Sequence, residues 1–470
     1  MFKKTKIICT QGPATDAPGV IEQLIKNGMN CARFNFSHGD HPSHKLRIDA
    51  VKAAAKKMNR VVSLILDTKG PEMRLGEFAN GEVMLTAGNK FTLTNDDTPG
   101  DETHCSVSHK LLYTEIAPGN KLLLSDGLVE LMVDEISGKD IVTTILNSGK
   151  MSTRKRVAAP GVTLGLPAIS EQDEKDIIFG IEQDMDFVAA SFIQRASDVE
   201  DLRRLIARHG GHMEIIPKIE CLAGVQNIDD IIAVSDGIMV ARGDLGVEIP
   251  AEDVPIIQKE IIKKCNDAGK PVIVATQMLE TMTTNPRPTR AEVSDVGNAI
   301  WDGADAIMLS GETAGGKYPV EATATMNRIA LRIESALSYK KIFEEKGVHH
   351  KNSQTDAIAH ASVQLAYELR AKAIITPTKS GYTTKIVSKY RPKATIVAFA
   401  PNQMVARHLN LRWGVFVIPD VQWLNPAEMI DYVAKVTQER GFVKEGDITV
   451  ITSGIKYGAG GTSAIQLHTI

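Results

Sequence analysis

The chain has 470 residues, of which 43% are hydrophobic, 24% charged and 5% aromatic. This composition is typical of a globular protein and excludes a disordered or fibrous one, while the length predicts roughly two to four domains. The formal net charge of −3 provides no excess of basic residues for nucleic acid or an anionic membrane, so we expect small-molecule partners, no nucleic acid and no membrane.

Eight short apolar segments are predicted strands, and a helical pattern follows each of them. The predicted strands are Lys4 to Thr10, Asn30 to Phe36, Val61 to Asp67, Phe187 to Phe192, Glu214 to Glu220, Gly237 to Arg242, Pro271 to Gln277 and Ala306 to Ser310. The predicted helices are Pro18 to Asn27, Pro42 to Met58, Glu171 to Gln183, Asp198 to His209, Gly224 to Val234, Asp253 to Ala268, Arg290 to Trp301 and Pro319 to Leu337. Eight repeated strand–helix units predict a TIM barrel.

The third unit is interrupted between Gly70 and about Pro167, where the segments are short and alternate in polarity. Predicted strands here include Val83 to Thr86, Phe91 to Thr94, Lys121 to Leu124 and Asp140 to Leu146. The pattern predicts an inserted all-β domain. Without it, about 240 residues remain up to Lys340, close to the roughly 250 typical of a TIM barrel.

After the polar stretch Lys346 to Thr355, a second α/β series predicts a C-terminal domain with a smaller parallel sheet. Its predicted elements are a helix from Asp356, a strand over Ala373 to Thr376, a helix near Thr383 to Tyr390 and a strand over Thr395 to Ala400. The predicted fold is therefore α/β, a (β/α)8 TIM barrel (1–69 and 167–345) with an inserted β-barrel domain (70–166) and a C-terminal α/β domain (346–470).

The cysteines and the first residues favour a cytoplasmic protein. The five cysteines form no CxxC pair, which argues against a disulfide framework or a zinc site and indicates a reducing compartment. The chain also lacks an apolar signal core and any apolar run of ~18 residues.

Active sites of TIM barrels lie at the carboxyl ends of the strands, and polar residues gather there in this sequence. Lys218 and Glu220 are two apart on one predicted strand and point to the same face, while Asp244 follows the next strand. Two such carboxylates are a common way of holding magnesium, and a lysine beside them would stabilise charge on a transferring phosphoryl group. Taken alone, Lys218 and Glu220 could equally form a structural ion pair.

Two further groups of residues follow the strands. Asn35, Ser37, Asp67 and Thr68 offer oxygen ligands suited to a hard cation, including a monovalent one. Arg33 and Arg74 suit phosphate groups, although isolated arginines are usually surface residues. His38 could be a loop residue that binds nothing, Thr276 could be structural, and Gly243 could either admit a ligand close to the backbone or form a simple turn.

Five segments closely resemble the pyruvate kinase family: Arg33 to Gly39, Leu66 to Arg74, Lys218 to Glu220, Met239 to Glu248 and Asn285 to Asp295. The resemblance covers nearly the whole chain. It implies transfer of the phosphoryl group of phosphoenolpyruvate to ADP, giving pyruvate and ATP in the final step of glycolysis. It further implies Mg2+ and K+ as cofactors, a homotetramer, a catalytic barrel and a lid formed by the inserted domain.

The resemblance also implies residue roles, carried over by position. Lys218, Arg33 and Thr276 would be catalytic, and Arg33, Lys218, Gly243, Asp244 and Thr276 would contact phosphoenolpyruvate. Glu220 and Asp244 would bind magnesium, and Asn35, Ser37, Asp67 and Thr68 potassium. Asn35, Phe36, Ser37, His38, Arg74 and Lys155 would reach the nucleotide. Glu72 matches potassium-dependent members, while Gln11, Arg156 and Ala158 depart from the usual pattern.

In the C-terminal domain, Thr378, Lys379, Ser380, Gly381 and Thr383 lie between a predicted strand and helix. Amides and hydroxyls at a helix start can cradle a phosphate, although Ser and Thr also cap helices without a ligand. The segment looks like the family's sugar-phosphate effector loop, which implies allosteric regulation. Fructose 1,6-bisphosphate, ribose 5-phosphate and AMP all remain open as the effector.

Two other functions are compatible with parts of the pattern. One is a metal-dependent lyase or aldolase acting on phosphoenolpyruvate or pyruvate, against which the inserted domain, Arg33 and Arg74 argue. The other is a non-catalytic sugar-phosphate sensor on a kinase scaffold. The presence of Lys218, Glu220 and Asp244 argues against a sensor.

Overall fold

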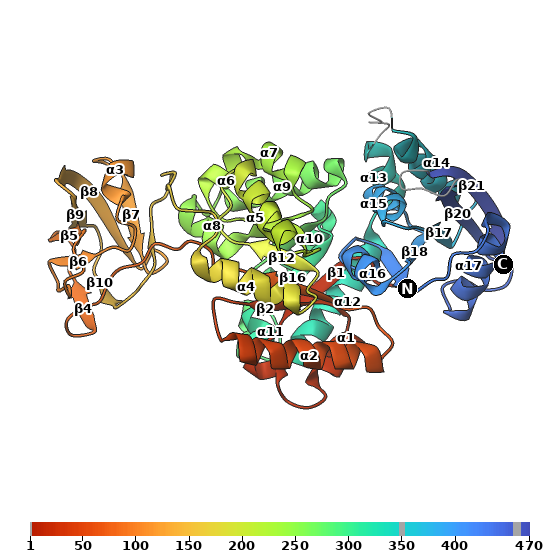
Figure 1. Cartoon of the computed structure of the whole chain (residues 1–470), viewed down its shortest axis with the longest axis horizontal. Helices are drawn as coiled ribbons and strands as arrows, with labels where there is room; N and C mark the ends of the chain where they lie inside the picture. Colours follow the sequence, from red (N-terminus) through yellow and green to blue (C-terminus); the bar gives the residue numbers. More distant parts are fainter. Residues whose placement is uncertain (1, 347–352, 455–461) are drawn as a thin grey trace.

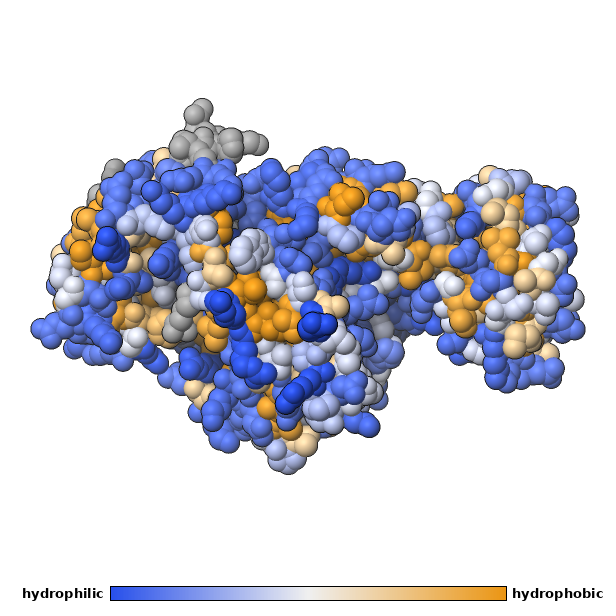
Figure 2. Space-filling view, turned by 180° about the vertical axis from the view of Figure 1, so that it is seen from behind, coloured by the Kyte–Doolittle hydropathy of each residue, from blue (hydrophilic) through white to orange (hydrophobic). Residues whose placement is uncertain are grey.

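The computed structural model describes residues 2–346, 353–454 and 462–470. A central barrel carries the small β domain on one side and the C-terminal α/β domain on the other (Figure 1). From behind, hydrophilic side chains cover most of the surface, and the β domain projects from the barrel as a separate lobe (Figure 2). Within the described ranges, every helix is too short or too polar to span a bilayer.

Eight parallel strands close the barrel in the order β1-β16-β15-β14-β13-β12-β3-β2, which confirms the predicted TIM barrel. The strands are β1 (Lys6–Thr10), β2 (Met29–Asn35), β3 (Ser63–Asp67), β12 (Phe187–Ala190), β13 (Glu214–Ile219), β14 (Ile238–Ala241), β15 (Val272–Ala275) and β16 (Ala306–Leu309). Ile8, Ile65, Phe187, Met239 and Ile273 fill the barrel interior. Buried on both faces, these strands are almost continuously apolar, which made them visible in the sequence.

Helices surround the barrel, and those that match the prediction are α1 (Val20–Lys26), α2 (His41–Lys57), α4 (Glu171–Glu182), α5 (Ala196–Arg208), α9 (Val254–Ala268), α10 (Arg290–Asp302) and α12 (Pro319–Ala336). Three of them begin at capping residues, because the side chains of Asp40, Ser170 and Thr289 accept hydrogen bonds from the amides three residues on. Short helical turns add η1 (Pro13–Thr15), η2 (Glu280–Thr283) and α11 (Gly311–Ala314).

Two barrel helices differ from the prediction. The single helix expected over Gly224 to Val234 is two helices, α6 (Leu222–Gln226) and α7 (Ile228–Val234), separated at Asn227. A further helix, α8 (Arg242–Glu248), starts directly where β14 ends. Two of the seven residues of α8 are glycines, which disfavour helix, so the residue pattern did not predict this helix.

The inserted domain is all-β, as predicted, apart from the single helical turn α3 (Leu112–Glu115). Its strands are β4 (Glu82–Leu85), β5 (Lys90–Thr94), β6 (His104–Ser106), β7 (Lys121–Leu124), β8 (Val129–Ser137), β9 (Asp140–Ile145), β10 (Gly149–Ser152) and β11 (Val157–Ala158). Six form one sheet in the order β11-β7-β8-β9-β5-β6, and β10 pairs with β4. Leu85, Phe91, Leu122 and Leu131 belong to a core separate from that of the barrel.

The C-terminal domain is α/β, as predicted, with a sheet ordered β19-β18-β17-β20-β21. Its strands are β17 (Ala373–Pro377), β18 (Thr395–Phe399), β19 (Val415–Ile418), β20 (Ile448–Gly454) and β21 (Thr462–Thr469). Its helices are α14 (Gln354–Glu368), α15 (Tyr382–Lys389), α16 (Gln403–Leu409) and α17 (Pro426–Glu439). The sheet is mixed rather than parallel, because β21 pairs antiparallel with β20.

The junction between the barrel and the C-terminal domain contains α13 (Tyr339–Lys346). Phe343 of α13 packs into the core of the C-terminal domain, with its ring 6.0 Å from that of Tyr390. Of the predicted polar stretch Lys346 to Thr355, residues 347–352 lie outside the described residues. The three domain boundaries stay predictions, and the packing of α13 favours a start for the C-terminal domain before Tyr339.

Candidate active site

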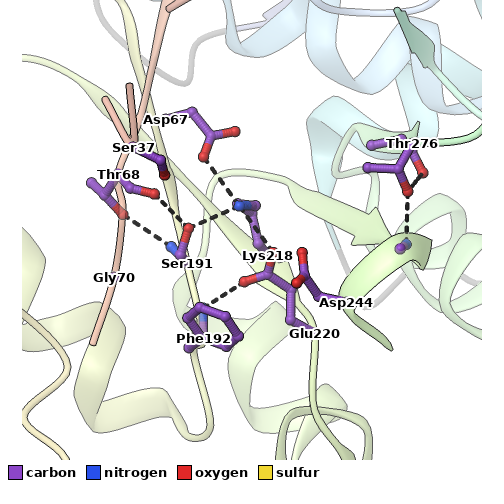
Figure 3. Close-up of polar contacts among 12 residues, drawn as sticks. Ser37, Asp67, Thr68, Gly70, Ser191, Phe192, Lys218, Glu220, Asp244 and Thr276 are labelled. Atoms are coloured by element: carbon purple, nitrogen blue, oxygen red, sulfur yellow. Dashed lines mark hydrogen bonds and ion pairs between the residues drawn. The ribbon is translucent and has the colours of Figure 1, made fainter. Parts of the chain in front are cut away.

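The carboxyl ends of the barrel strands bring most of the predicted residues to one mouth of the barrel (Figure 3). Asp67 ends β3, Lys218 lies near the end of β13, and Glu220 follows that strand by one residue. Asp244 comes from the first turn of α8, and Thr276 follows β15. The parallel order of the barrel places all of these strand ends on the same side.

The ammonium of Lys218 lies at the centre of this group. Its Nζ is 3.1 Å from Asp67 Oδ1, 2.8 Å from Ser191 Oγ and 2.9 Å from Glu220 Oε1. Burial by itself lowers the pKa of Lys218, but the carboxylates of Asp67 and Glu220 together outweigh it and raise the pKa above its ordinary value. Lys218 is therefore a buried, permanently charged group aimed into the mouth of the barrel.

Asp67 holds two cations at once. Its Oδ2 accepts a hydrogen bond from Arg33 Nε at 2.6 Å, while its Oδ1 accepts one from Lys218. Burial raises the pKa of Asp67, yet Arg33 and Lys218 outweigh that effect and leave the pKa below its usual range. Arg33 also donates from Nη1 to Thr10 Oγ1 at 3.0 Å. The guanidinium is thereby fixed at the end of β2.

The carboxylate of Glu220 is fully buried, and one of its two oxygens lacks an aligned hydrogen bond among the described residues. Its Oε2 accepts a hydrogen bond from the amide of Phe192 at 2.8 Å. Its Oε1 is within ion-pair distance of Lys218, but accepts a well-aligned hydrogen bond from no described residue. Burial raises the pKa of Glu220, the ammonium of Lys218 lowers it, and the nearby charge of Asp244 raises it again, so that the pKa stays above its ordinary value. The two carboxylates lie next to each other in Figure 3.

A divalent cation fits this pair of acids. Carboxylate oxygens are the preferred ligands of Mg2+, and the buried Oε1 of Glu220 pairs with Lys218 but accepts no aligned hydrogen bond from the described residues, which leaves it able to bind a metal. Among the described residues, no group of three or more His, Cys, Asp and Glu side chains is arranged to hold a metal. An ion at Glu220 and Asp244 would therefore take its other ligands from water or from a substrate.

Thr276 sits in a strained stretch of backbone, since it and Gln277 have φ values of 66° and 53°. Its hydroxyl donates to the carbonyl of Ala275 at 2.6 Å and accepts from the amide of Gly243 at 2.8 Å. Gly243 is therefore not a simple turn glycine, because it lies in the first turn of α8. Its amide is held towards β15 by Thr276.

Arg242, which the sequence analysis did not single out, supports the same stretch of backbone. Its Nη2 donates to the carbonyl of Thr276 at 2.7 Å, and its Nη1 pairs with Asp295 of α10 at the same distance. Arg242 thus ties α10 to the strained turn after β15. The position of Arg242 directly before Gly243 and Asp244 is the sequence feature that could have indicated this role.

The predicted potassium ligands adjoin the Lys218 network. Asn35 Oδ1 accepts from the amide of Ser37 at 3.1 Å, which shapes the turn after β2. Thr68 Oγ1 accepts from the amide of Ser191 at 3.1 Å, and Asp67 is the residue before Thr68. Figure 3 shows Ser37, Asp67 and Thr68 on the same side of Lys218.

The predicted nucleotide residues come from two domains. The ring of Phe36 is buried against His44, with ring centroids 4.2 Å apart, so it serves the core. His38 contributes its carbonyl to a 2.8 Å hydrogen bond with His44 Nε2. Arg74 and Lys155 instead lie at the base of the inserted domain, where Arg74 pairs with Glu72. Among the described residues, no hydrogen bond or ion pair joins Asn35 to His38 with Arg74 or Lys155.

Sequence reasoning missed Ser191 and Phe192, which follow β12. Ser191 Oγ accepts a hydrogen bond from Lys218 and donates to the carbonyl of Thr68 at 2.6 Å. Phe192, with a φ of 55°, presents its amide to Glu220. The predicted strand Phe187 to Phe192 is two residues longer than β12, so the end of the fourth strand was placed too late to reveal them.

Two of the three departures from the family pattern are buried residues, and the Oε1 of Gln11 has no hydrogen-bond partner among the described residues. Gln11 is buried and donates from Nε2 to the carbonyl of Cys9 at 2.9 Å. Ala158 is buried in β11. Arg156 is different, because its guanidinium bonds to Asp244 and lies over the ring of Phe192, 4.8 Å from its centroid.

The candidate effector loop caps α15 in the C-terminal domain. Gly381 is the N-cap residue with a φ of 84°, and its amide donates to Thr378 Oγ1 at 3.0 Å. Thr383 Oγ1 is 2.6 Å from Thr462 Oγ1, and Lys379 Nζ is 5.5 Å from the ring centroid of Trp423. Ser380 is exposed. The hydroxyl of Thr378 therefore shapes the turn before α15 without capping the helix, and the helix start is compatible with a phosphate.

Comparison with known proteins agrees with this geometry. Residues 2–323 match the family model "Pyruvate kinase, barrel domain" and residues 356–468 match "Pyruvate kinase, alpha/beta domain". Pyruvate kinase of Geobacillus stearothermophilus is 49% identical over 474 residues, covering 100% of this chain and 81% of the relative. That of Clostridium acetobutylicum is 48% identical over 464 residues, covering 98% of both.

The fold comparison agrees as well. A crystal structure of a pyruvate kinase from Cryptosporidium parvum superimposes with a TM-score of 0.96 at 39% identity, covering 99% of this chain and 96% of that one. Both the sequence and the three-domain architecture therefore match the same family over almost the entire length. This chain belongs to the pyruvate kinase family.

Proposed function

We propose that this chain transfers the phosphoryl group of phosphoenolpyruvate to ADP and releases pyruvate and ATP. The observation that carries this proposal is the buried, charged Lys218 beside the carboxylates of Glu220 and Asp244. Phosphoryl transfer depends mainly on positioning and on charge stabilisation, and this site offers fixed groups of both signs. The near-complete match to catalytic relatives supports the same activity.

Each residue of the site has its own role in the proposed phosphoryl transfer. Lys218 would stabilise negative charge on the migrating phosphoryl group, since its ammonium is already held in place by Asp67 and Ser191. Arg33 uses Nε and Nη1 for internal hydrogen bonds, and its Nη2, which bonds to no described residue, would bind the phosphate. Glu220 and Asp244 would hold Mg2+. When bound, that ion would neutralise charge on the phosphoryl oxygens.

The second half of the reaction protonates the enolpyruvate that remains. The hydroxyl of Thr276 is engaged with Ala275 and Gly243, so we propose that it positions an ordered water rather than giving up its own proton. Gly243 would place its backbone next to phosphoenolpyruvate. Closure of the inserted domain over the barrel would exclude other water and limit hydrolysis.

We further propose that Asn35, Ser37, Asp67 and Thr68 bind K+ and that Asn35 to His38, Arg74 and Lys155 bind ADP or ATP. The hydroxyl and carboxylate oxygens of the first set suit a monovalent ion, and Glu72 supports potassium dependence through the family pattern. A phosphorylated effector at residues 378–383, a homotetramer and a cytoplasmic location complete the proposal. Titrating fructose 1,6-bisphosphate, ribose 5-phosphate and AMP at low phosphoenolpyruvate identifies the effector.

The activity is tested by measuring pyruvate formation from phosphoenolpyruvate and ADP with purified protein. We expect turnover that requires Mg2+ and rises when K+ replaces Na+. A protein that binds phosphoenolpyruvate without turnover would fit the sensor hypothesis. Release of phosphate or pyruvate without ATP formation would fit the hypothesis of a lyase or another barrel enzyme.

A further inference from the structure

Arg156 reaches from the base of the inserted domain into the site proposed for the metal. Its backbone is fixed on both sides, because its carbonyl accepts from the amide of Ser125 at 2.9 Å and the amide of Val157 donates to Met73 at 2.8 Å. From this base, Nη1 makes a hydrogen-bonded ion pair with Asp244 Oδ1. The two residues are 88 positions apart and belong to different domains.

The guanidinium of Arg156 is largely shielded from solvent. The Arg156 side chain is only 11% exposed, and its plane lies over the ring of Phe192, whose amide holds Glu220. A planar cation stacked on an aromatic ring is a favourable arrangement when it is desolvated. Arg156 therefore contacts both one proposed metal ligand and the residue that orients the other.

The positive charge of Arg156 also offsets the negative charge of the acidic residues around the proposed metal site. Burial lowers the pKa of Arg156, but the carboxylates of Asp244, Glu220 and Glu248 outweigh it and raise the pKa above its ordinary value. A divalent cation bound to Glu220 and Asp244 would supply the same compensation. The guanidinium and the metal would then compete for one carboxylate, since Arg156 occupies Oδ1 of Asp244.

A second carboxylate lies close to the guanidinium of Arg156. Asp126 Oδ1 is 3.6 Å from Arg156 Nη1 and is itself 67% exposed. Asp126 belongs to the inserted domain, so an ion pair with it would move with that domain if the bond to Asp244 broke. The geometry thus provides Arg156 with one partner on the barrel and one on its own domain.

We propose that Arg156 is a positioning residue that competes with the divalent cation for Asp244, so that metal binding detaches the base of the inserted domain from the barrel. This inference rests on the proposed metal site at Glu220 and Asp244. Once detached, the guanidinium is free to follow the domain as it moves. A glycine or other neutral residue at position 156 would leave metal binding uncoupled from the domain.

Mn2+ binding to the protein without substrates tests the competition, with free Mn2+ measured by electron paramagnetic resonance. Arg156→Ala is expected to bind Mn2+ about tenfold more tightly, the effect of losing one charge-assisted competitor. Arg156→Lys is expected to lie between that variant and the parent protein. Arg154→Ala is the matched control, because Arg154 carries the same charge nearby but pairs with Glu77 of its own domain. It should leave the affinity unchanged.

The outcomes separate the inference from the proposed site. Equal Mn2+ affinity of Arg156→Ala and the parent protein overturns the competition if Asp244→Asn has lost binding. Retained Mn2+ affinity in Asp244→Asn instead overturns the metal site, and the inference falls with it. A gain in affinity for Arg154→Ala as large as that for Arg156→Ala would show a general charge effect and also overturns the inference.

The coupling is tested on the unaltered protein by hydrogen exchange, which avoids any folding defect of a variant. Adding Mn2+ is expected to increase deuterium uptake at the amides of Leu75 and Val157. Their hydrogen bonds to Lys155 and Met73 join the two segments that connect the inserted domain to the barrel, and the contact of Arg156 with Asp244 braces those segments. In Arg156→Ala these amides should exchange faster even without metal. Unchanged uptake on addition of Mn2+ contradicts the detachment.

Discussion

The hydroxyl of Ser191 accepts a hydrogen bond from the ammonium of Lys218 at 2.8 Å and donates one to the carbonyl of Thr68 at 2.6 Å. Lys218 is thereby linked to the segment proposed to bind K+. A cation bound beside Thr68 would act on Lys218 through the hydroxyl of Ser191. Ser191→Ala should lower kcat about tenfold, since it removes one hydrogen bond to a charged group.

Steady-state kinetics check this prediction, with Ser191→Thr as the partner variant that keeps the hydroxyl. The alanine variant should also show a weaker increase of kcat when K+ replaces Na+. A kcat equal to that of the parent protein would remove Ser191 from a positioning role.

Lys218→Met should lower kcat at least ~10²-fold, by loss of a group that stabilises charge in the transition state. Binding of phosphoenolpyruvate should remain detectable by calorimetry, because Arg33 is still present. Lys263→Met is the control, since Lys263 is 79% exposed on α9 and pairs only with Asp267. Undiminished turnover in the Lys218 variant would exclude the proposed role.

Thr276→Ala should lower kcat with little change in the KM for ADP, because Thr276 is proposed to contact phosphoenolpyruvate and its hydroxyl fixes the amide of Gly243. Thr276→Ser keeps the hydroxyl and should restore most of the activity. The protonation step is followed separately by the exchange of pyruvate methyl protons with deuterated water. If exchange and kcat are both unchanged in the alanine variant, Thr276 is structural.

Glu214 of β13 pairs with Lys385 of α15 at 2.6 Å and ties the barrel to the C-terminal domain. Burial raises the pKa of Glu214, but Lys385 and Arg412 outweigh it and leave the pKa below its ordinary value. The folded state therefore binds this proton less readily than the unfolded state. The contribution to stability is present above the unfolded pKa of about 4.3 and is lost as the pH falls through the folded value.

Urea denaturation between pH 7 and pH 3 measures this effect. The midpoint of the parent protein should fall on acidification more steeply than that of Glu214→Gln, which lacks the titrating group. Glu439→Gln is the control, since Glu439 is 60% exposed and its ion pair with Lys435 is long, at 3.9 Å. If the urea midpoints of the parent protein and Glu214→Gln fall in parallel as the pH is lowered, Glu214 does not contribute to the pH dependence of stability.

The sequence by itself determined the order of the domains, the eight barrel strands and the strand ends that carry Lys218, Glu220 and Asp244. These features are local, because a strand buried on both faces must be apolar along its length and a polar residue directly after it stands out. Boundaries were less well determined. Ser191 and Phe192 were missed because the apolar residues Phe192 and Ile193 follow Ser191, so the predicted strand ran past the end of β12.

Only the tertiary structure decided which of these residues meet. Lys218 contacts Asp67 across 151 positions of sequence, Glu214 contacts Lys385 across 171, and Arg156 contacts Asp244 between two domains. Such contacts depend on how the strands close into a barrel and where the inserted domain lies, and neither is encoded in the spacing of apolar residues along one strand. For the same reason, the sequence could mark Arg156 as unusual but could not assign its partner.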